Sequence, residues 1–366
     1  MKLQKIQNKL RYYARRIDFH LYINTRYERS KRGLASKLKS IEVPPLTKEQ
    51  KKAIDAIWKG RKFDYGWFEF YNSLMINSHD KSLEYPIEWY IPNDFYYAEI
   101  DPYYNKLAEG RALDDKNIYD LLFNGVSQPK TVGRIIDGVI MDAGYKTIDK
   151  ENLINACVSS QSVIFKPSIG TVGGKGIAFW DKSTDSIERI NEIIEENDNV
   201  IVQEVVKQSA TLAQLHPSSL QTIRIITMYS AGKVEILSSV LRMGQGNSKV
   251  DNVSAGGIAA GIDDTGSLRK YAYNVNGIRF EKHPTTNVEF EGIQIPSFIE
   301  CCDLVKKLAP RLGRTQRLVS WDISLDINNM PVLIEANLTY GQLDFHQMCN
   351  GPLFKERIIQ ILSNIK

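Results

Sequence analysis

A fold that contains both helices and strands is expected for this chain of 366 residues, because short β-branched runs bounded by turn residues occur together with amphipathic helices. Two hairpins support this expectation most strongly. The first, over residues 162–180, joins a lysine to a glycine-rich loop, and the second, over residues 318–340, carries acidic side chains. The length allows two or three subdomains that share a sizeable core.

The first hairpin resembles a flap over a phosphate group. Residues 162–166 are apolar and end in Lys166, residues 177–180 are apolar again, and the two runs predict paired strands. Glycines in the connecting loop let the backbone approach a ligand closely, and the lysine supplies a positive charge for phosphate. An ordinary glycine-rich hairpin is the structural alternative. The loop glycines are Gly170, Gly173, Gly174 and Gly176.

Three common phosphate loops do not fit this stretch. A Walker loop needs glycine and Ser or Thr where the chain has Ile169 and Gly176. The dinucleotide fingerprint needs a helix after its glycines, but residues 177–180 predict a strand. A protein-kinase loop places its lysine after the glycines, whereas Lys166 precedes them. A flap that closes over a nucleotide is the remaining functional interpretation.

The second hairpin predicts a magnesium site. A turn centred on residues 328–329 places Asp322 opposite Glu335, with Asn337 on the same face. Two opposed carboxylates repel each other, so a cation is expected between them. Carboxylate and amide oxygens suit Mg²⁺, which phosphates and water usually complete. Solvent-facing acids with a capping asparagine are the alternative.

Composition narrows the class of protein. The chain is 43% hydrophobic and 25% charged, which is ordinary for a globular domain, and it has no apolar run long enough to cross a membrane. The N-terminus lacks the apolar core of a secretory signal. The four cysteines have neither metal-ligand nor disulfide spacing, and Cys301 and Cys302 are expected to pack inside a helix. We therefore expect a cytoplasmic protein.

Basic side chains gather near the N-terminus. Residues 1–40 contain twelve lysines and arginines but only Asp18 and Glu28 as acids. Interleaved apolar residues predict an amphipathic helix, which would suit an anionic membrane face, a phosphorylated acceptor or nucleic acid. A solvated helix flank is the alternative, and no nucleic-acid motif accompanies the charges. Residues 58–104 are rich in aromatic side chains, which are expected to form a small core rather than to stack on a ligand.

The order of these features resembles the ATP-grasp superfamily, and the D-alanine–D-alanine ligase type most closely. Lys116 at a helix start, Lys166 with its loop, residues 200–206 and the acidic hairpin follow one another as in that superfamily, over residues 112–340. The stretches HPSSLQTIRIIT and DNVSAGG are similar to a branch associated with sugar transfer and surface polysaccharides. The resemblance implies two α+β subdomains that clasp ATP, after a basic helical extension. The implied domains are residues 1–45, 46–111, 112–206 (lid) and 207–366.

The resemblance also implies a role for particular residues. ATP phosphates would meet Lys116 and Lys166, and adenine would meet the segment formed by Gln203, Glu204 and Val205. Two Mg²⁺ ions would be held by Asp322, Glu335 and Asn337. The flap residues would be Ser168, Gly170, Gly173, Gly174, Lys175 and Gly176.

An arginine of the superfamily is missing two residues before Asp322, where the chain has Ser320. Arg224 or Arg242 would take its role and stabilise the transferring phosphate together with Lys166. No ribose-binding acid is apparent after Glu204. The loop after Arg242 would hold the acceptor, with a plain strand connection as the alternative, and His216 is expected to be structural. The acceptor contacts would be Asp251, Asn252, Ser254, Gly256 and Gly257.

The resemblance implies an ATP-dependent carboxylate–amine ligase that works through an acylphosphate. Its substrates would be a small or sugar-linked acid and an amine of polysaccharide biosynthesis. A kinase acting on a hydroxyl would need the same phosphate site, so it remains an alternative, as does an ATP-binding module without chemistry. Contact with the inner membrane face through residues 1–40 is a further expectation.

Overall fold

The computed structural model describes residues 24–78, 83–169, 174–339 and 341–365. It divides into two compact units. Unit 1 contains Met1–Lys106, Asn276–Ile278 and Gln342–Lys366, and unit 2 contains Leu107–Val275 and Arg279–Gly341. Every residue of the expected nucleotide and metal sites belongs to unit 2.

Unit 1 is helical and has an aromatic core. Trp58 lies edge-on to Phe68 and Phe95, with ring centroids 5.7 and 5.3 Å apart, and all three rings are buried. These aromatic residues therefore form a core, as expected. The helices are α2 (Lys48–Trp58), α3 (Gly66–Ser78), η2 (Ile87–Trp89), α4 (Asn93–Phe95), η3 (Tyr96–Ile100), α5 (Asp101–Tyr104), α12 (Leu343–Asn350), η6 (Lys355–Arg357) and α13 (Ile358–Asn364).

The basic segment begins unit 1 as a helix over residues 24–40. Tyr27, Leu34 and Lys37 are buried on one face of this helix, whereas the apolar residues on which the amphipathic prediction depends lie within residues 1–23. The Lys37 ammonium is 3.0 Å from the Asp344 carboxylate. Residues 1–23, which hold half of the expected basic charge, lie outside the described part of the chain.

The first sheet of unit 2 lies within residues 112–206, for which the resemblance implied a lid, and we call it the lid sheet, or lid, below. Its five strands are antiparallel in the order β2–β1–β5–β3–β4, and α8 and α9 pack on one face around Leu153, Trp180 and Ile190. The elements are β1 (Thr131–Ile136), β2 (Val139–Asp142), α8 (Lys150–Ser159), β3 (Ser162–Pro167), β4 (Ala178–Asp181), α9 (Ile187–Glu195) and β5 (Val200–Glu204).

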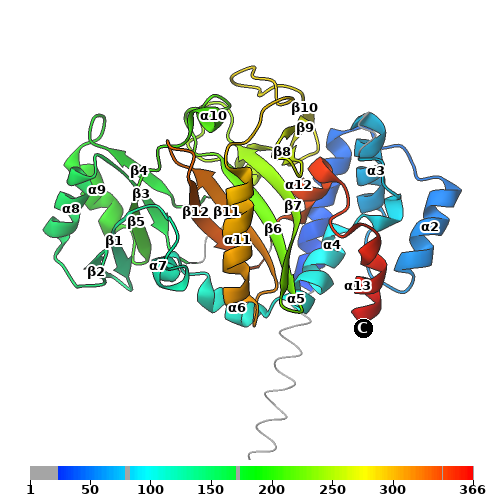
Figure 1. Ribbon diagram of the computed structural model, residues 1–366, viewed down its shortest axis with the longest axis horizontal. Coiled ribbons are helices and arrows are strands. Elements are labelled where there is room, and N and C mark those ends of the chain that lie inside the picture. Colours follow the sequence, from blue (N-terminus) through cyan, green and yellow to red (C-terminus); the bar gives the residue numbers. More distant parts are fainter. Residues whose placement is uncertain (1–23, 79–82, 170–173, 340, 366) are drawn as a thin grey trace, which may run out of the picture. The chain divides into compact units, whose positions relative to one another are not determined.

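The second sheet of unit 2 has seven antiparallel strands in the order β10–β9–β8–β7–β6–β11–β12. Helix α11 (Phe298–Leu312) packs on it, with Cys301 and Cys302 buried in the core as expected (Figure 1). The strands are β6 (Thr222–Ser230), β7 (Lys233–Met243), β8 (Ile258–Ile262), β9 (Leu268–Asn274), β10 (Arg279–Phe280), β11 (Leu318–Leu325) and β12 (Pro331–Asn337).

Short elements connect and flank the two sheets of unit 2. They are α6 (Leu107–Leu113), η4 (Lys116–Ile118), α7 (Tyr119–Leu122), α10 (Ala210–Ala213) and η5 (Val253–Ala255).

Several predicted boundaries need correction. The pattern of residues 353–365 predicts one last helix, but α13 begins at Ile358 after the short turn η6. Helices α3 and α12 were not predicted. Helix α3 is rich in apolar residues and shows little periodicity, and α12 buries the polar His346 and Gln347 beside its apolar residues. A threonine followed three residues later by glutamine predicts a capping box, and Thr47 and Gln50 form one at the start of α2.

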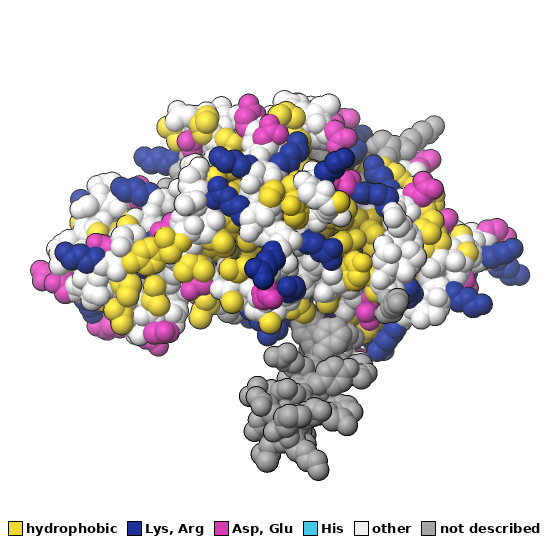
Figure 2. Space-filling view, turned by 60° about the horizontal axis from the view of Figure 1, so that its bottom comes forward, with side chains coloured by type: hydrophobic (Ala, Val, Ile, Leu, Met, Phe, Trp, Pro, Cys, Tyr) yellow, Lys and Arg dark blue, Asp and Glu magenta, His cyan; other side chains and the backbone are white. Residues whose placement is uncertain are grey.

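Two surface properties bear on location and partners. Within the described residues, no helix is long and apolar enough to cross a membrane. Figure 2 shows lysine and arginine side chains scattered over the drawn face, with aspartate and glutamate among them. The described side chains of that face form no single basic stripe of the kind that binds nucleic acid.

Candidate functional site

The acidic hairpin has the predicted register. Asp322 of β11 lies directly opposite Glu335 of β12, and Ser320 lies opposite Asn337. A bulge after Asp322 shifts the remaining pairs toward the turn by one residue. The bulge leaves the two carboxylates paired across the strands, where they can act together.

Two arginines hold the Asp322 carboxylate. Arg224 of β6 is the cross-strand neighbour of Asp322, and its Nε and Nη2 atoms donate to Oδ1 and Oδ2 at 2.7 Å each. Arg242 of β7 donates from Nη1 to Oδ2 at 3.0 Å. Burial raises the pKa of Asp322, but Arg224 and Arg242 outweigh it and hold the pKa at about 2. This carboxylate is therefore ionised throughout the neutral range.

Asp251 extends the cluster from the expected acceptor loop. Its Oδ1 lies 3.3 Å from Arg242 Nη2, and its Oδ2 accepts from the Thr222 hydroxyl. Burial raises the pKa of Asp251 even though Arg242 opposes the shift. The side chain that was expected to meet the acceptor is thus already bonded to an arginine, and its role toward an acceptor stays a prediction.

The rest of that loop is tightly packed. A Cβ atom at Gly257 would lie 2.6 Å from the Met243 carbonyl oxygen, so only glycine fits without a shift. Gly256 has a φ of 105°, which an L side chain rarely adopts. Asn252 is half-buried, and the Ser254 side chain lies outside the described part.

His216 and His283 hold the start of the loop after Met243 through hydrogen bonds. The His216 ring lies 2.8 Å from Ser219 Oγ and 2.9 Å from the Gly246 carbonyl oxygen. His283 Nε2 donates to the Gly244 carbonyl at 2.8 Å and its Nδ1 accepts from a backbone N–H. Both rings are buried. His216 is therefore structural, as expected.

Lys116 connects the lid to the acidic hairpin. Its Nζ lies 2.9 Å from Glu335 Oε1, and its backbone N–H donates to the Ser168 carbonyl at 3.0 Å. Burial lowers the pKa of Lys116, but Glu335 outweighs burial and raises it overall. The predicted phosphate lysine and the predicted metal ligand are thus in contact.

Lys166, unlike Lys116, has a neutral amide as its hydrogen-bond partner. Its Nζ donates to Gln203 Oε1 at 3.0 Å. Burial lowers the pKa of Lys166 to about 8, although Glu335 raises it. A lysine stabilised mainly by an amide oxygen would gain from an incoming phosphate.

The structure describes the first residues of the flap, 168–169, and its last residues, 174–176. Ser168 is buried, Lys175 is exposed, and Gly174 and Gly176 have φ of 75° and 77°. These positive values agree with the conformational freedom expected of the loop. Gly170 and Gly173 lie outside the described residues.

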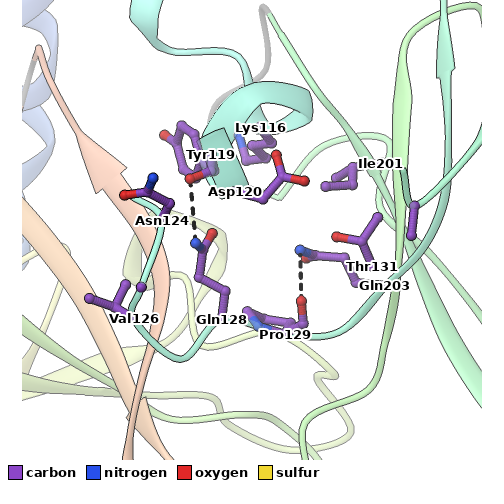
Figure 3. A pocket seen from close by; sticks show the side chains of 12 residues that line it. Lys116, Tyr119, Asp120, Asn124, Val126, Gln128, Pro129, Thr131, Ile201 and Gln203 are labelled. Carbon is purple, nitrogen blue, oxygen red and sulfur yellow. Dashed lines mark hydrogen bonds between the residues drawn. The ribbon is translucent and has the colours of Figure 1, made fainter. Parts of the chain in front are cut away.

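A cavity of about 360 Å³ opens beside Lys116. Figure 3 shows the side chains of Lys116 and Asp120 on one side and those of Ile201 and Gln203 on the other. Of the residues expected to meet the nucleotide, Lys116 and Gln203 line it. Glu204 instead pairs with Lys130 at 2.7 Å, and Val205 is not part of the lining.

The expected metal ligands fit Mg²⁺ in atom type. The described residues contain no group of three His, Cys, Asp or Glu side chains that could hold a metal, so the Asn337 carboxamide would have to contribute. Its nitrogen donates to the Ser320 carbonyl and Asp322 Oδ2 at 3.2 and 3.3 Å, which turns its oxygen the other way. Glu335 and Asn337 are thus suited to a hard cation, whereas both oxygens of Asp322 already accept from arginine.

Sequence reasoning missed one titratable neighbour of this site. Burial raises the pKa of Asp114 to about 6, while Lys116 lowers it and Glu335 raises it. The Tyr119 hydroxyl donates to Asp114 at 3.3 Å. An acidic residue two positions before the phosphate lysine was the signal in the sequence.

Comparison with known proteins decides the family. The sequence profile of the sugar-transfer associated ATP-grasp family matches residues 97–363. The chain belongs to this family. Its α+β fold, with a helical N-terminal region and two antiparallel sheets, is the ATP-grasp fold. ATP-grasp proteins are typically ATP-dependent ligases that use ATP and Mg²⁺.

Solved structures of several ligases are similar at low identity. D-cycloserine synthetase DcsG is 12% identical over 86% of this chain and 92% of its own, with a TM-score of 0.42. The ATP-grasp ligase PsnB, complexed with a phosphomimetic variant of minimal precursor, Mg and ADP, is 13% identical over 72% and 62% of the two chains, with a TM-score of 0.41.

D-alanyl-alanine synthetase A from Vibrio cholerae O1 biovar eltor str. N16961 is 14% identical over 72% of this chain and 64% of its own, with a TM-score of 0.39. The chain spans only 45% of the purK structure and 62% of PsnB bound to its precursor peptide. No curated protein matches the chain.

Proposed function

We propose that this protein is an ATP-dependent carboxylate–amine ligase. The observation that carries the proposal is the placement of Lys116 of η4 and Lys166 of β3 beside the acidic hairpin of the other sheet. Lys116 pairs with Glu335, and Glu335 acts on the pKa of the half-buried Lys166. Such a set of fixed charges suits the transfer of a phosphoryl group from ATP.

The reaction would proceed in two displacements. A carboxylate oxygen of the acid attacks the γ-phosphorus, the bond between the β,γ-bridging oxygen and that phosphorus breaks, and ADP leaves. The amine nitrogen then attacks the acyl carbon of the acylphosphate, the carbon–oxygen bond to phosphate breaks, and the amine loses a proton to solvent. The products are an amide, ADP and phosphate.

Each part of the site has a task in this scheme. Lys116 and Lys166 would bind the phosphates, and the flap over residues 168–176 would exclude water from the acylphosphate. Arg242 would stabilise the transferring phosphoryl group, because its buried Nε has no hydrogen-bond partner among the described residues, whereas Arg224 Nε donates to Asp322.

Glu335 and Asn337 would be the first ligands of Mg²⁺, with Asp322 joining them if an arginine releases it. Bound Mg²⁺ would neutralise charge on the phosphates and polarise the γ-phosphoryl group. Gln203 would meet the base, because it lines the cavity beside Lys116.

The substrates are proposed from the family. Its association with sugar transfer supports an acid or amine that is joined to a sugar or a polysaccharide precursor. The loop that holds Asp251 and Asn252 would bind this acceptor. The basic N-terminal segment would bring the cytoplasmic enzyme to the inner membrane face, where such precursors are built.

Hydroxylamine trapping tests the proposal. The protein is incubated with Mg·ATP, hydroxylamine and a panel of amino acids and uronic acids, and hydroxamate and ADP are measured. Hydroxamate that depends on one acid, and is lost in Glu335→Gln, supports an acylphosphate. A stable phosphorylated product without hydroxamate would establish the kinase alternative, and ATP binding without any turnover across the panel would favour the non-catalytic alternative.

A further inference from the structure

Arg134 is a buried cation that the proposed chemistry does not use. It lies on β1 with no exposed surface. Its Nη1 donates to the Asn117 carbonyl at 2.6 Å, and its Nη2 donates to Asp120 Oδ2 at 2.9 Å and to the Ala143 carbonyl at 3.0 Å. The guanidinium of the lid is thus bonded to the segment that follows Lys116.

Tyr145 completes this contact from the turn after β2. Its ring centroid lies 3.8 Å from the Arg134 guanidinium carbon, and its hydroxyl is 2.7 Å from the Asn117 carbonyl and 2.6 Å from Asp120 Oδ1. Tyr145 has a φ of 65°, a left-handed conformation that is unfavourable for a non-glycine residue. The surrounding bonds hold this strained conformation, so the contact is specific in geometry.

Apart from the bond to Ala143, all of these bonds end on one short segment. Residues 116–118 form η4 and residues 119–122 form α7, so Asn117 and Asp120 lie within four residues of Lys116. The Asn117 side chain adds a bond from Nδ2 to the Ile135 carbonyl of β1 at 3.3 Å. The Arg134 Nε has no partner among the described residues, so the guanidinium is held through its two terminal nitrogens.

The other end of the segment reaches the nucleotide machinery. The Lys116 N–H bonds the flap base at Ser168, while Lys116 Nζ extends to Glu335 of the other sheet. The backbone of this turn is therefore attached to the lid, whereas its charged end points at the acidic hairpin. A displacement of the turn over residues 116–122 would therefore move the Lys116 ammonium away from Glu335, which belongs to the other sheet.

We propose that Arg134 is a positioning residue that fixes the turn of Lys116 to the lid, so that Lys116 meets the ATP phosphates as part of the lid. The inference rests on the proposed role of Lys116 in phosphate binding. Tyr145 supports Arg134 by stacking on it and by sharing its acceptors. Arg134 itself touches neither nucleotide nor acceptor.

A double-mutant cycle in ATP affinity tests this role. ATP is titrated calorimetrically into wild type, Arg134→Met, Lys116→Met and the double variant. We expect each single variant to bind ATP about tenfold more weakly, as is usual for residues that orient a ligand-binding group. The double variant should bind no more than about twofold more weakly than Lys116→Met alone, because Arg134 acts through Lys116.

The proposal would be overturned if the two substitutions weakened ATP binding independently of each other. If Arg134→Met weakens binding equally with and without Lys116, or has no effect on binding, Arg134 does not position Lys116. If wild type itself does not bind ATP, the proposed function fails instead. Arg189→Met, which changes an exposed arginine of the lid helix α9, is the matched control and should leave affinity unchanged.

A second variant covers the case in which Arg134→Met does not fold. Tyr145→Phe removes only the hydroxyl and keeps the ring against the guanidinium, so folding is expected to persist. In the same cycle it should weaken ATP binding about threefold in the presence of Lys116 and not at all in Lys116→Met. An effect of Tyr145→Phe that is the same in both backgrounds would contradict the proposal.

Discussion

Lys166 should make nucleotide binding depend on pH above neutrality. Burial lowers its pKa to about 8, and its described partner is the amide oxygen of Gln203. Only the protonated ammonium attracts phosphate, so affinity should fall as pH rises through about 8. Roughly nine-tenths of the group is charged at pH 7 and roughly one-tenth at pH 9, which corresponds to a loss of about tenfold in affinity, or about 1.4 kcal/mol.

Calorimetric titration with ATP at about pH 7, 8 and 9 measures this effect. It is done without Mg²⁺, so that Glu335 keeps the charge that acts on Lys166. Buffers of different ionisation enthalpy report proton uptake, which should approach about one per ATP at the highest pH. Lys166→Arg stays charged throughout and should change by less than about twofold. A flat wild-type profile, or equal profiles for wild type and variant, would refute the reasoning.

Four other expectations follow from the same contacts. Asp322→Asn removes the charge that two buried arginines share and should lower the free energy of unfolding, measured in urea, by about 3–5 kcal/mol. The exposed Asp303→Asn should change it by less than about 1 kcal/mol, and equal effects of the two substitutions would contradict the buried pairing. Glu335→Gln should fold normally and lose Mg²⁺-dependent turnover, and retained turnover would place the metal elsewhere. Burial lowers the pKa of His283, so below about pH 6.5 the unfolded state binds the proton first and the free energy of unfolding falls as pH falls. The contribution of His283 to this pH dependence should disappear in His283→Gln, and an unchanged dependence would argue against the shifted pKa. Deleting residues 1–23 should preserve thermal stability but weaken binding to vesicles of anionic lipid at low salt, whereas deleting residues 1–40 also removes the buried Leu34 and should lower stability; unchanged vesicle binding would discard the membrane role.

Features that depend on residues close together in the sequence were correctly predicted. The capping box of Thr47 and Gln50 depends on residues three positions apart. The pairing of Asp322 with Glu335 was counted out from a turn centred on residues 328–329, and it holds because the bulge after Asp322 offsets a one-residue shift of the pairs nearer the turn. Asn329 adopts a positive φ of 60°, which asparagine tolerates. The capping box thus follows from residue types and spacing, whereas the register of the hairpin also depends on the bulge.

Elements without a clear period were harder to predict. Helix α12 buries the polar His346 and Gln347 as well as its apolar residues, so polarity does not mark which of its faces is exposed. The strand pair β1 and β2 is short and half-buried, and residues 129–132 predict only the entry to a strand. Such segments acquire their structure from the core around them more than from their own pattern.

The sequence by itself determined the two hairpins, the lysine of the flap, the order of the site residues and, through these, the family. Only the tertiary structure decided which charges meet. Arg224 and Arg242 lie 98 and 80 positions from Asp322, and they reach it because β7, β6 and β11 are consecutive strands in one sheet. Lys116 meets Glu335, and Arg134 meets Asn117, because the lid and its neighbouring turn pack in one unit. Strand order and packing follow from the burial of whole cores, which no local pattern of residues reveals.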